Sequence, residues 1–425
     1  MPLAAPVSLR LSSRLRPLPR AAGSAPPAPE DHAQALARGL TIPLTPGNRV
    51  ELLQDGPRTY EAMFEAISGA RHHVNLESYI LEADGPGEEF ARRLVERAAA
   101  GVCVNVLFDS FGSLRTPARF FERLRAGGVN VCEYNPLSRA ANLLSRAFHL
   151  RDHRKLMVVD GRIGFIGGVN ISAVYSSGSS PIAHKERDGD AAAAARPGWR
   201  DTHVRVEGPI VTELQRLFMR HWVRHSSIAL HGAPYYPPLE AAGGQRVALA
   251  ACDAGRRRNP FYRALLGAID AAQHRVLLTT AYLVPTRRLL RSLTQAAKRG
   301  VEVHLLLPGI SDFWAPLAAG RSHYGKLLRS GVHLHERHDT LLHAKTCVVD
   351  GLWTTVGSSN LDWRSFLHNA EANLIVLDEA LAQEMERVYA DDLARAEEID
   401  RAAWAQRGWR QRLAETVARR FEFFL

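Results

Sequence analysis

The chain has 425 residues, 46 % of them hydrophobic and 23 % charged, which suits a globular protein of about two domains and excludes a disordered one. No run approaches the roughly 18 uninterrupted apolar residues of a membrane-spanning helix. The four cysteines are dispersed without a CxxC pair, so neither a disulfide framework nor a thiolate zinc site is indicated. The net charge of +10 favours an anionic partner, either nucleic acid or an acidic lipid surface.

The first segment of the chain is rich in arginine, proline, alanine and serine and has no acidic residue before Glu30. We expect residues 1–44 to form a disordered basic arm, because such a composition cannot build a core. The same composition also fits a mitochondrial transit peptide, so the arm could be a targeting segment.

From Gly47 onward the chain carries one succession of elements twice. In each copy the end of a helix leads into a strand, then an amphipathic helix ends at a glycine, and an apolar strand follows. This alternation predicts an α/β fold of two similar halves with mixed sheets flanked by helices, related by a pseudo-twofold axis. The matched segments are Ala66–Val74 with Ala268–Val276, Phe90–Ala100 with Leu289–Arg299, and Val102–Phe108 with Val301–Leu307.

The repeat also predicts the domain boundaries. We expect a first half over residues 45–235 and a second half over 245–400, separated where proline and glycine cluster. Residues 176–198 have no counterpart in the second half and predict a surface insertion. Glu386–Arg401 has the pattern of a charged helix. The basic, amphipathic segment 401–425 suits an anionic bilayer interface, and a helix packed on its own domain would carry the same pattern.

Each half carries an HxKxxxxD motif followed by a turn of small residues that ends in asparagine. One His, one Lys and one Asn therefore recur in fixed register, and a pseudo-twofold axis would bring the two histidines face to face at the seam between the halves. The residues are His153, Lys155, Asp160 and Asn170 in the first half, and His343, Lys345, Asp350, Ser358 and Asn360 in the second.

These residue types suit displacement at the phosphorus of a phosphodiester, which needs a nucleophile, charge neutralisation and a proton for the leaving oxygen. A neutral imidazole can attack phosphorus while a second, protonated imidazole gives its proton to the leaving group. Lys155 and Lys345 suit the non-bridging oxygens, and Asn170 and Asn360 add neutral donors. With this cationic density a metal ion is unnecessary, so we expect neither a metal nor a cofactor.

The two motifs resemble those of the phospholipase D superfamily, in both copies and in register. The resemblance favours His153 as nucleophile and His343 as general acid and base, although the near symmetry of the sequence does not by itself decide between them. It also implies that an acid at a set distance after each motif orients that histidine. Glu371 is the acid for His343, and Asp201, displaced by the insertion, is its first-half equivalent.

The motif aspartates Asp160 and Asp350 belong to the site residues that the resemblance implies. Both follow a predicted strand and precede a glycine. We therefore expect them to fix the loop as turn residues and not to carry protons.

The sequence around the motifs is similar to that of bacterial cardiolipin synthases, in particular of the branch without N-terminal transmembrane helices. The similarity covers residues 45–425. The resemblance implies transfer of a phosphatidyl group from phosphatidylglycerol to a second phosphatidylglycerol through a phosphohistidine, by a protein in peripheral contact with the cytoplasmic face of the inner membrane. The similar stretches are Gly47–Leu53, Met157–Asn170, Arg200–Pro209, Thr279–Pro285 and Gly357–Ser365.

Two other activities would use the same catalytic residues. Water can resolve the same intermediate, which would make the protein a phospholipid hydrolase. A nuclease of the superfamily would act on a DNA backbone, and the basic composition would suit it. The sequence carries no helix-turn-helix, zinc-finger or aromatic RNA-binding signature, so nucleic acid is not the expected partner.

Overall fold

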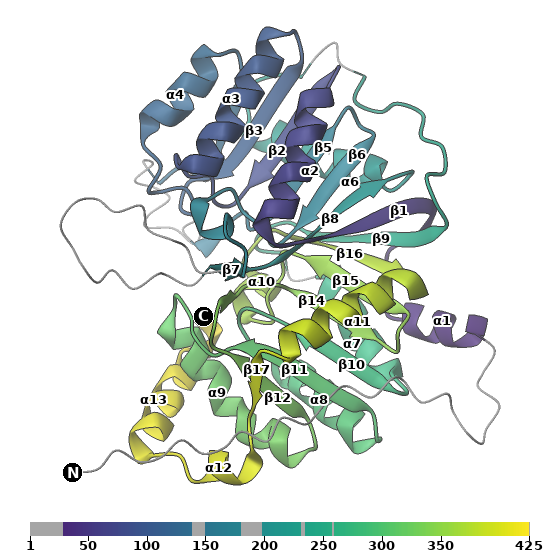
Figure 1. Ribbon diagram of the computed structural model, residues 1–425, viewed down its shortest axis with the longest axis vertical. Coiled ribbons are helices and arrows are strands. Elements are labelled where there is room, and N and C mark those ends of the chain that lie inside the picture. Colours follow the sequence, from purple (N-terminus) through teal and green to yellow (C-terminus); the bar gives the residue numbers. More distant parts are fainter. Residues whose placement is uncertain (1–28, 138–148, 180–197, 231–233, 257–258, 425) are drawn as a thin grey trace.

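The computed structural model describes residues 29–137, 149–179, 198–230, 234–256 and 259–424. Figure 1 shows two α/β halves stacked along the long axis of the molecule, with the seam between them. The predicted fold class is confirmed.

Each half contributes seven strands in an equivalent succession to one large sheet. Those of the first half are β1 (Thr45–Gln54), β2 (His73–Ser78), β3 (Cys103–Asp109), β4 (Asn130–Tyr134), β5 (Lys155–Val159), β6 (Ile163–Gly167) and β8 (Thr202–Glu207). Those of the second half are β9 (Gln245–Cys252), β10 (Arg275–Thr279), β11 (Glu302–Pro308), β12 (His333–Arg337), β14 (Thr346–Val349), β15 (Trp353–Gly357) and β16 (Glu371–Leu377).

These strands and the short β17 (Ala396–Glu398) join into a single mixed sheet of 15 strands. Its order is β17-β12-β11-β10-β14-β15-β16-β9-β1-β8-β6-β5-β2-β3-β4. Read outward from the antiparallel pair β1 and β9 at the centre, both halves follow the same pattern, with β17 added at one edge. A separate parallel pair, β7 (Trp199–Arg200) with β13 (Leu341–Leu342), bridges the halves beside the seam.

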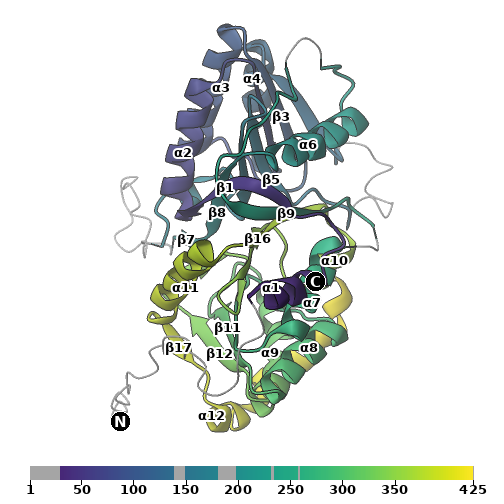
Figure 2. The same cartoon turned by 90° about the vertical axis from the view of Figure 1, so that its right-hand side faces the viewer.

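Helices cover both faces of the sheet, as Figure 2 shows. The first half has α2 (Asp55–Gly69), α3 (Gly85–Ala99) and α4 (Ala118–Ala126) on one face and α6 (Val211–His225) on the other. The equivalent helices of the second half are α7 (Pro260–Ala271), α8 (Arg287–Lys298) and α9 (Trp314–Arg329), with α11 (Glu379–Leu393) opposite. Shorter helices are α1 (Pro29–Ala37), α10 (Trp363–Leu367), α12 (Arg401–Ala405) and α13 (Trp409–Arg420).

The apolar core extends through the seam. One buried cluster lies under α2, α3 and α4, and a second lies under α7, α8 and α9. A third combines side chains of α6 and α11 with inner strands of both halves, such as Val158, Trp222 and Val348. Because this third cluster takes residues from both halves, each half completes the core of the other.

Two expectations about the ends of the chain are wrong. Residues 29–44 are not a disordered arm, because α1 buries Leu36 in the second-half core and lies against α7. Close packing is possible there because Gly39 has no side chain: a Cβ atom would lie 2.8 Å from the Cα atom of Gly267. The predicted charged helix 386–401 ends early, since α11 stops at Leu393 and β17 then pairs with the edge strand β12.

Some predicted segments lie outside the described residues. These are the arginine-rich residues 1–28 and most of the predicted insertion, residues 180–197. Among the helices that are described, none is both long and apolar enough to span a bilayer.

Candidate active site

The two motif histidines lie at the seam, and the backbone of each is held by the opposite half. His153 directly precedes Arg154 and β5, and its N–H donates to the carbonyl of Ala370 at 2.9 Å. His343 lies between β13 and β14, and its N–H donates to the carbonyl of Arg200 at 2.8 Å. Ala370 and Arg200 are each followed by an acid, so these bonds bring a carboxylate to the opposite motif.

The orienting acids are therefore exchanged between the halves. Nδ1 of His153 lies 3.1 and 3.2 Å from the two carboxylate oxygens of Glu371. Nδ1 of His343 lies 2.6 Å from Oδ2 of Asp201. Both predicted acids reach a histidine, but the expectation that each serves its own half is wrong. The reason is that β8 and β16, which begin beside these acids, run next to the central strands and reach across the seam.

These contacts fix the tautomer of His153. Besides Glu371, the carbonyl of Ser358 lies 3.1 Å from its Nδ1, and a carbonyl can only accept. Nδ1 therefore carries the hydrogen, and Nε2 keeps its lone pair. Burial, followed by the charges of Lys155 and Lys345, holds the pKa of His153 well below its usual value, so the ring is neutral at pH 7.

His343 has a different charge environment. Its Nδ1 donates to Asp201, because a carboxylate can only accept, and the ammonium of Lys345 lies 2.9 Å from the same nitrogen. Burial and then Lys345 lower the pKa of His343 to about 4. The pKa of Asp201 is below its usual value. Burial alone would raise this pKa, but Lys345 and His343 lower it further than burial raises it.

Glu371 differs from Asp201 in its protonation. Burial raises the pKa of Glu371 to about 7, against the opposing charge of Lys155. The hydroxyl of Ser358 donates to Glu371 at 2.5 Å. In the first half the equivalent residue is Gly168, where a Cβ atom would lie 2.0 Å from Oδ1 of Asp201. The two halves thus share one plan but bind their acids differently.

Both motif lysines are buried in the site. The ammonium of Lys155 donates to the carbonyl of His153 at 2.6 Å, and that of Lys345 donates to the carbonyl of His343. Burial lowers the pKa of Lys155 to about 7 and that of Lys345 to about 8. An arriving phosphate would restore their full charge, because a nearby anion favours the protonated form.

The two asparagines are not equivalent. The side-chain amide of Asn170 donates to the hydroxyl of Tyr175 at 2.8 Å, and its oxygen accepts from the N–H of Ile80. The side-chain oxygen of Asn360 has no hydrogen-bond partner among the described residues, so this side chain has the greater freedom to bind a ligand.

Asp160 and Asp350 lie at the far ends of β5 and β14, away from the histidines. Each adopts a positive φ, 53° and 52°, and each is followed by a glycine. The carboxylate of Asp350 accepts the N–H groups of Gln273, His274 and Arg275 at 2.7 to 2.8 Å. Asp160 does the same for residues 71–73. These bonds make both aspartates turn residues, in agreement with the sequence-based interpretation.

Comparisons with known proteins place this site in a family. A family model described as "Cardiolipin synthase, PLD-like domain" matches residues 63–178 and 265–393, more than half of the chain and one segment in each half. The chain belongs to the cardiolipin synthase family of phospholipase D-like proteins. Members of this family are phosphatidyltransferases.

Two relatives carry the family assignment over most of the sequence. The chain is 37 % identical to cardiolipin synthase A of Pseudomonas aeruginosa (strain LESB58) over 369 residues, which cover 86 % of this chain and 71 % of that protein. It is 32 % identical to cardiolipin synthase of Geobacillus kaustophilus (strain HTA426) over 379 residues, 89 % of this chain and 72 % of the relative.

A solved structure supports the fold. Phosphatidylserine synthase of Haemophilus influenzae Rd KW20 superposes with a TM-score of 0.65 at 14 % identity, covering 93 % of this chain and 99 % of that one. At this identity the likeness shows the two-half architecture alone.

Aromatic side chains around the histidines escaped the sequence-based prediction of the cardiolipin synthase-type site. The ring of Tyr79 lies 5.0 Å from that of His153, and the ammonium of Lys155 lies 5.2 Å from the Tyr79 ring. Trp199 lies 4.9 Å from His343, whose Nδ1 is also 3.2 Å from the hydroxyl of Tyr175. The available signal was a tyrosine shortly after each of the equivalent strands β2 and β10, namely Tyr79 and Tyr282.

The surroundings of the motifs break the internal symmetry. Behind His153 the first half buries Glu77, Asp152 and His221, whose ligand atoms are close enough to one another to hold a metal ion. Nδ1 of His221 lies 3.0 Å from Glu77, and a guanidinium nitrogen of Arg154 lies 3.5 Å from the same oxygen. Arg154 thus already supplies a positive charge to this cluster.

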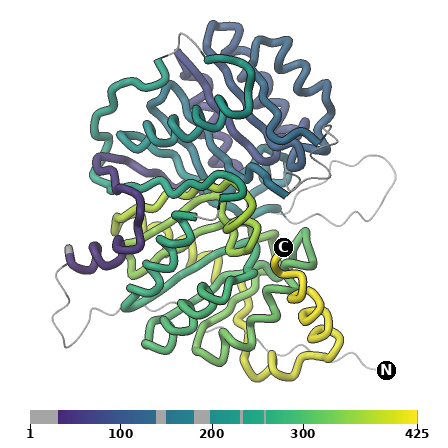
Figure 3. Tube along the Cα trace, turned by 180° about the vertical axis from the view of Figure 1, so that it is seen from behind, coloured from purple at the N-terminus to yellow at the C-terminus, as the bar shows by residue number. Residues whose placement is uncertain are grey.

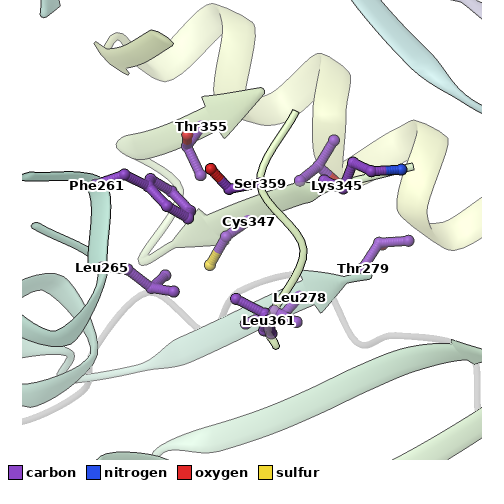
Figure 4. Close-up of a pocket in the computed structure, with 10 residues that line it drawn as sticks. Phe261, Leu265, Leu278, Thr279, Lys345, Cys347, Thr355, Ser359 and Leu361 are labelled. Atoms are coloured by element: carbon purple, nitrogen blue, oxygen red, sulfur yellow. The ribbon is translucent and has the colours of Figure 1, made fainter. Parts of the chain in front are cut away.

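The second half has uncharged residues at the corresponding positions, with Thr279 in place of Glu77 and Ala344 in place of Arg154. The charged residues Glu77 and Arg154 therefore have no charged counterpart in the second half. Figure 4 shows a small cavity on the side of the sheet that α7 covers, which is lined by Phe261, Leu265, Leu278 and Cys347 and from which the amine of Lys345 points away.

Proposed function

We propose that this protein is a cardiolipin synthase that moves a phosphatidyl group from one phosphatidylglycerol to another through a phosphohistidine on His153. The observation that carries the proposal is the pair of histidines whose Nδ1 atoms are bound by exchanged acids and which each have a buried lysine beside them. Among the described residues no group binds Nε2 of either ring, so both nitrogens can meet a substrate.

In the first step the non-bridging oxygens of the donor phosphate bind Lys155 and Lys345. Nε2 of His153 attacks phosphorus, forming the N–P bond while the bond to the glycerol oxygen breaks. The bound anion raises the proton affinity of His343, and the negatively charged Asp201 stabilises the imidazolium. His343 gives its proton to the departing glycerol.

In the second step the hydroxyl of a second phosphatidylglycerol takes the place of glycerol. His343 removes its proton as the oxygen attacks phosphorus, and the bond to His153 breaks. Two phosphatidylglycerol molecules thus yield one cardiolipin and one glycerol.

The different acids support this division of roles. Asp201, with its lowered pKa, keeps a full negative charge beside His343, which suits the ring that cycles a proton. Glu371, with a pKa of about 7, holds less charge beside His153, which suits the ring that stays neutral before attack.

We also propose that the protein works as a peripheral protein on the cytoplasmic face of the inner membrane. The net charge of +10 supports this, because that surface is rich in anionic lipid.

Product analysis tests the reaction. Purified protein is incubated with phosphatidylglycerol vesicles and, separately, with single-stranded DNA. Cardiolipin and glycerol in equal amounts are the expected products, with no cleavage of DNA. Phosphatidic acid in place of cardiolipin would mean that water is the acceptor and the protein a hydrolase. Cleaved DNA with unchanged lipid would make it a nuclease.

A further inference from the structure

The last helix of the chain points its apolar side away from the protein. On α13 the side chains of Trp409, Leu413, Val417 and Phe421 recur every fourth residue, and they are between 47 % and 70 % exposed. The opposite side, with Glu415 and Ala418, is buried against α9. We call the four exposed residues the α13 stripe. Packing on the protein therefore does not account for the stripe.

Two loops add exposed apolar residues near the site. Phe313 and Trp314, 62 % and 68 % exposed, follow β11 at the start of α9. Phe111 and Leu114 are exposed after β3, which is the equivalent strand of the first half.

The two loops and the histidines lie at the same ends of the strands. β3 runs parallel to β2, and β11 runs parallel to β10, so the loops share an edge with the residues that follow β2 and β10. β5 and β14 run antiparallel to β2 and β10, so the motif histidines that precede them lie at this edge as well.

The end of α13 reaches the same region. In Figures 1 and 3 the C-terminal end lies beside the loop that leads into α9. Glu422 lies 3.1 Å from His323 of α9, and the ring of Phe423 lies 5.6 Å from that of Trp363 in α10, three residues after Asn360. The C-terminal end of α13 therefore lies close to the second motif.

The charge around the stripe indicates which partner covers it. Arg410, Arg412, Arg419 and Arg420 are exposed on α13, and Arg115 and Arg119 are exposed beside Leu114. An apolar stripe bordered by arginines suits the interface of an anionic bilayer, where apolar side chains enter the acyl region and guanidinium groups bind lipid phosphates. Tryptophan and phenylalanine are among the residues that favour this interface.

We propose that the α13 stripe, with Phe313, Trp314, Phe111 and Leu114, docks the protein on an anionic lipid bilayer. This contact presents the histidine-bearing ends of the strands to the lipid headgroups. The inference rests on the proposed function, because it gives the site lipids to act on.

A flotation assay tests the docking surface. The whole chain of residues 1–425 is mixed with vesicles of phosphatidylcholine alone or with 30 mol % phosphatidylglycerol, which makes the surface anionic. The test variant is Leu413→Ser/Phe421→Ser. The control is Tyr236→Ser, which removes an aromatic side chain of similar exposure, 51 % against 58 %. Tyr236 lies beside the turn at Gly161, at the far end of β5 from His153.

We expect the wild type and the control to bind anionic vesicles, and the stripe variant to bind them at least tenfold more weakly with an unchanged melting temperature. The fluorescence of Trp409 should shift to shorter wavelength on binding. Its contribution is the difference between the spectra of the wild type and of Trp409→Phe. Equal binding by the stripe variant would overturn the inference. Self-association through the stripe would also overturn the inference. It would appear as a lower sedimentation mass of the stripe variant than of the wild type in the absence of vesicles.

Activity separates this inference from the proposed function. On short-chain phosphatidylglycerol below its critical micelle concentration, the stripe variant should retain the wild-type rate, whereas its rate on vesicles should fall with binding. If the wild type binds vesicles and the stripe variant does not, but no cardiolipin forms, the docking surface is supported and the proposed reaction is wrong. If cardiolipin forms and the stripe variant binds vesicles as well as the wild type does, the proposed reaction is supported and the docking surface is wrong.

Discussion

At the residue scale, the exchange of Glu371 and Asp201 between the histidines decides which acid supports which step. If Glu371 orients His153, it serves formation of the phosphohistidine. If Asp201 orients His343, it serves proton transfer to and from oxygen. The two acids can therefore be separated by a donor whose leaving group needs no proton.

Phosphatidyl-p-nitrophenol is such a donor. We predict that Asp201→Asn retains a burst of p-nitrophenol close to that of the wild type, while it loses cardiolipin synthesis by about 10³-fold. Glu371→Gln should lose both, because His153 loses the carboxylate that stabilises the positive charge its ring gains as Nε2 attacks phosphorus. The opposite grouping, with a burst in Glu371→Gln and none in Asp201→Asn, would mean that each acid serves its own half.

The lowered pKa values of the two motif lysines predict how kcat/KM changes at alkaline pH. Burial lowers the pKa of Lys155 to about 7 and that of Lys345 to about 8. Above these values the free enzyme loses the positive charge that binds phosphate, so kcat/KM should fall by at least tenfold between pH 7 and pH 9. Circular dichroism at each pH serves as the control for folding. A kcat/KM that stays level to pH 9 would contradict this assignment.

Sequence alone predicted most of the residues that meet in the candidate site but not their pairing. The HxKxxxxD spacing and the turn after it identified His153, Lys155 and their equivalents, because a motif fixes residues that are close in the chain. Which histidine receives Glu371 depends on β16 lying at the seam, and strand order is a property of the whole sheet. Tyr79 and Trp199 were missed for the same reason, since their contacts with the histidines are set by tertiary packing.

At the element scale, the motif aspartates fix the turns between helix and strand. Replacing Asp350 with alanine leaves three backbone N–H groups without their acceptor. It also places alanine, which adopts positive φ less readily than aspartate, at a φ of 52°. We predict a loss of about 2–4 kcal/mol in the free energy of unfolding, measured with urea.

The folded fraction of Asp350→Ala should keep a kcat within about threefold of the wild type, because the carboxylate lies at the opposite end of β14 from His343. Lys345→Ala, at the other end of β14, is the matched comparison, and it should lose activity with little change in urea midpoint. A folded Asp350→Ala protein without activity would instead indicate a direct part in the chemistry.

Short elements explain the errors at the ends of the chain. The helix α1 has nine residues and few apolar positions, and its stability comes from burial of Leu36 against the second half. The strand β17 has three residues, Ala396, Glu397 and Glu398, which carry no strand pattern. Tertiary pairing with β12 decides its structure.

At the scale of the whole molecule, the two halves form one cooperative unit. The sheet is continuous through β1 and β9, and a buried cluster takes side chains from both halves. We predict a single unfolding transition in guanidinium chloride, with coincident curves from far-UV circular dichroism and tryptophan fluorescence. Residues 45–235 expressed alone should lack a cooperative transition. Two separate transitions in the full chain would show that the halves fold independently.

The central claim is that His153 carries the phosphatidyl group while His343 moves the proton. Its most direct test is to mix the enzyme with phosphatidyl-p-nitrophenol, quench it in denaturant at alkaline pH, and map the modified peptide by mass spectrometry. We predict an adduct on His153 that accumulates in His343→Ala and is absent from His153→Ala. An adduct on His343, or full turnover by His153→Ala, would contradict the claim.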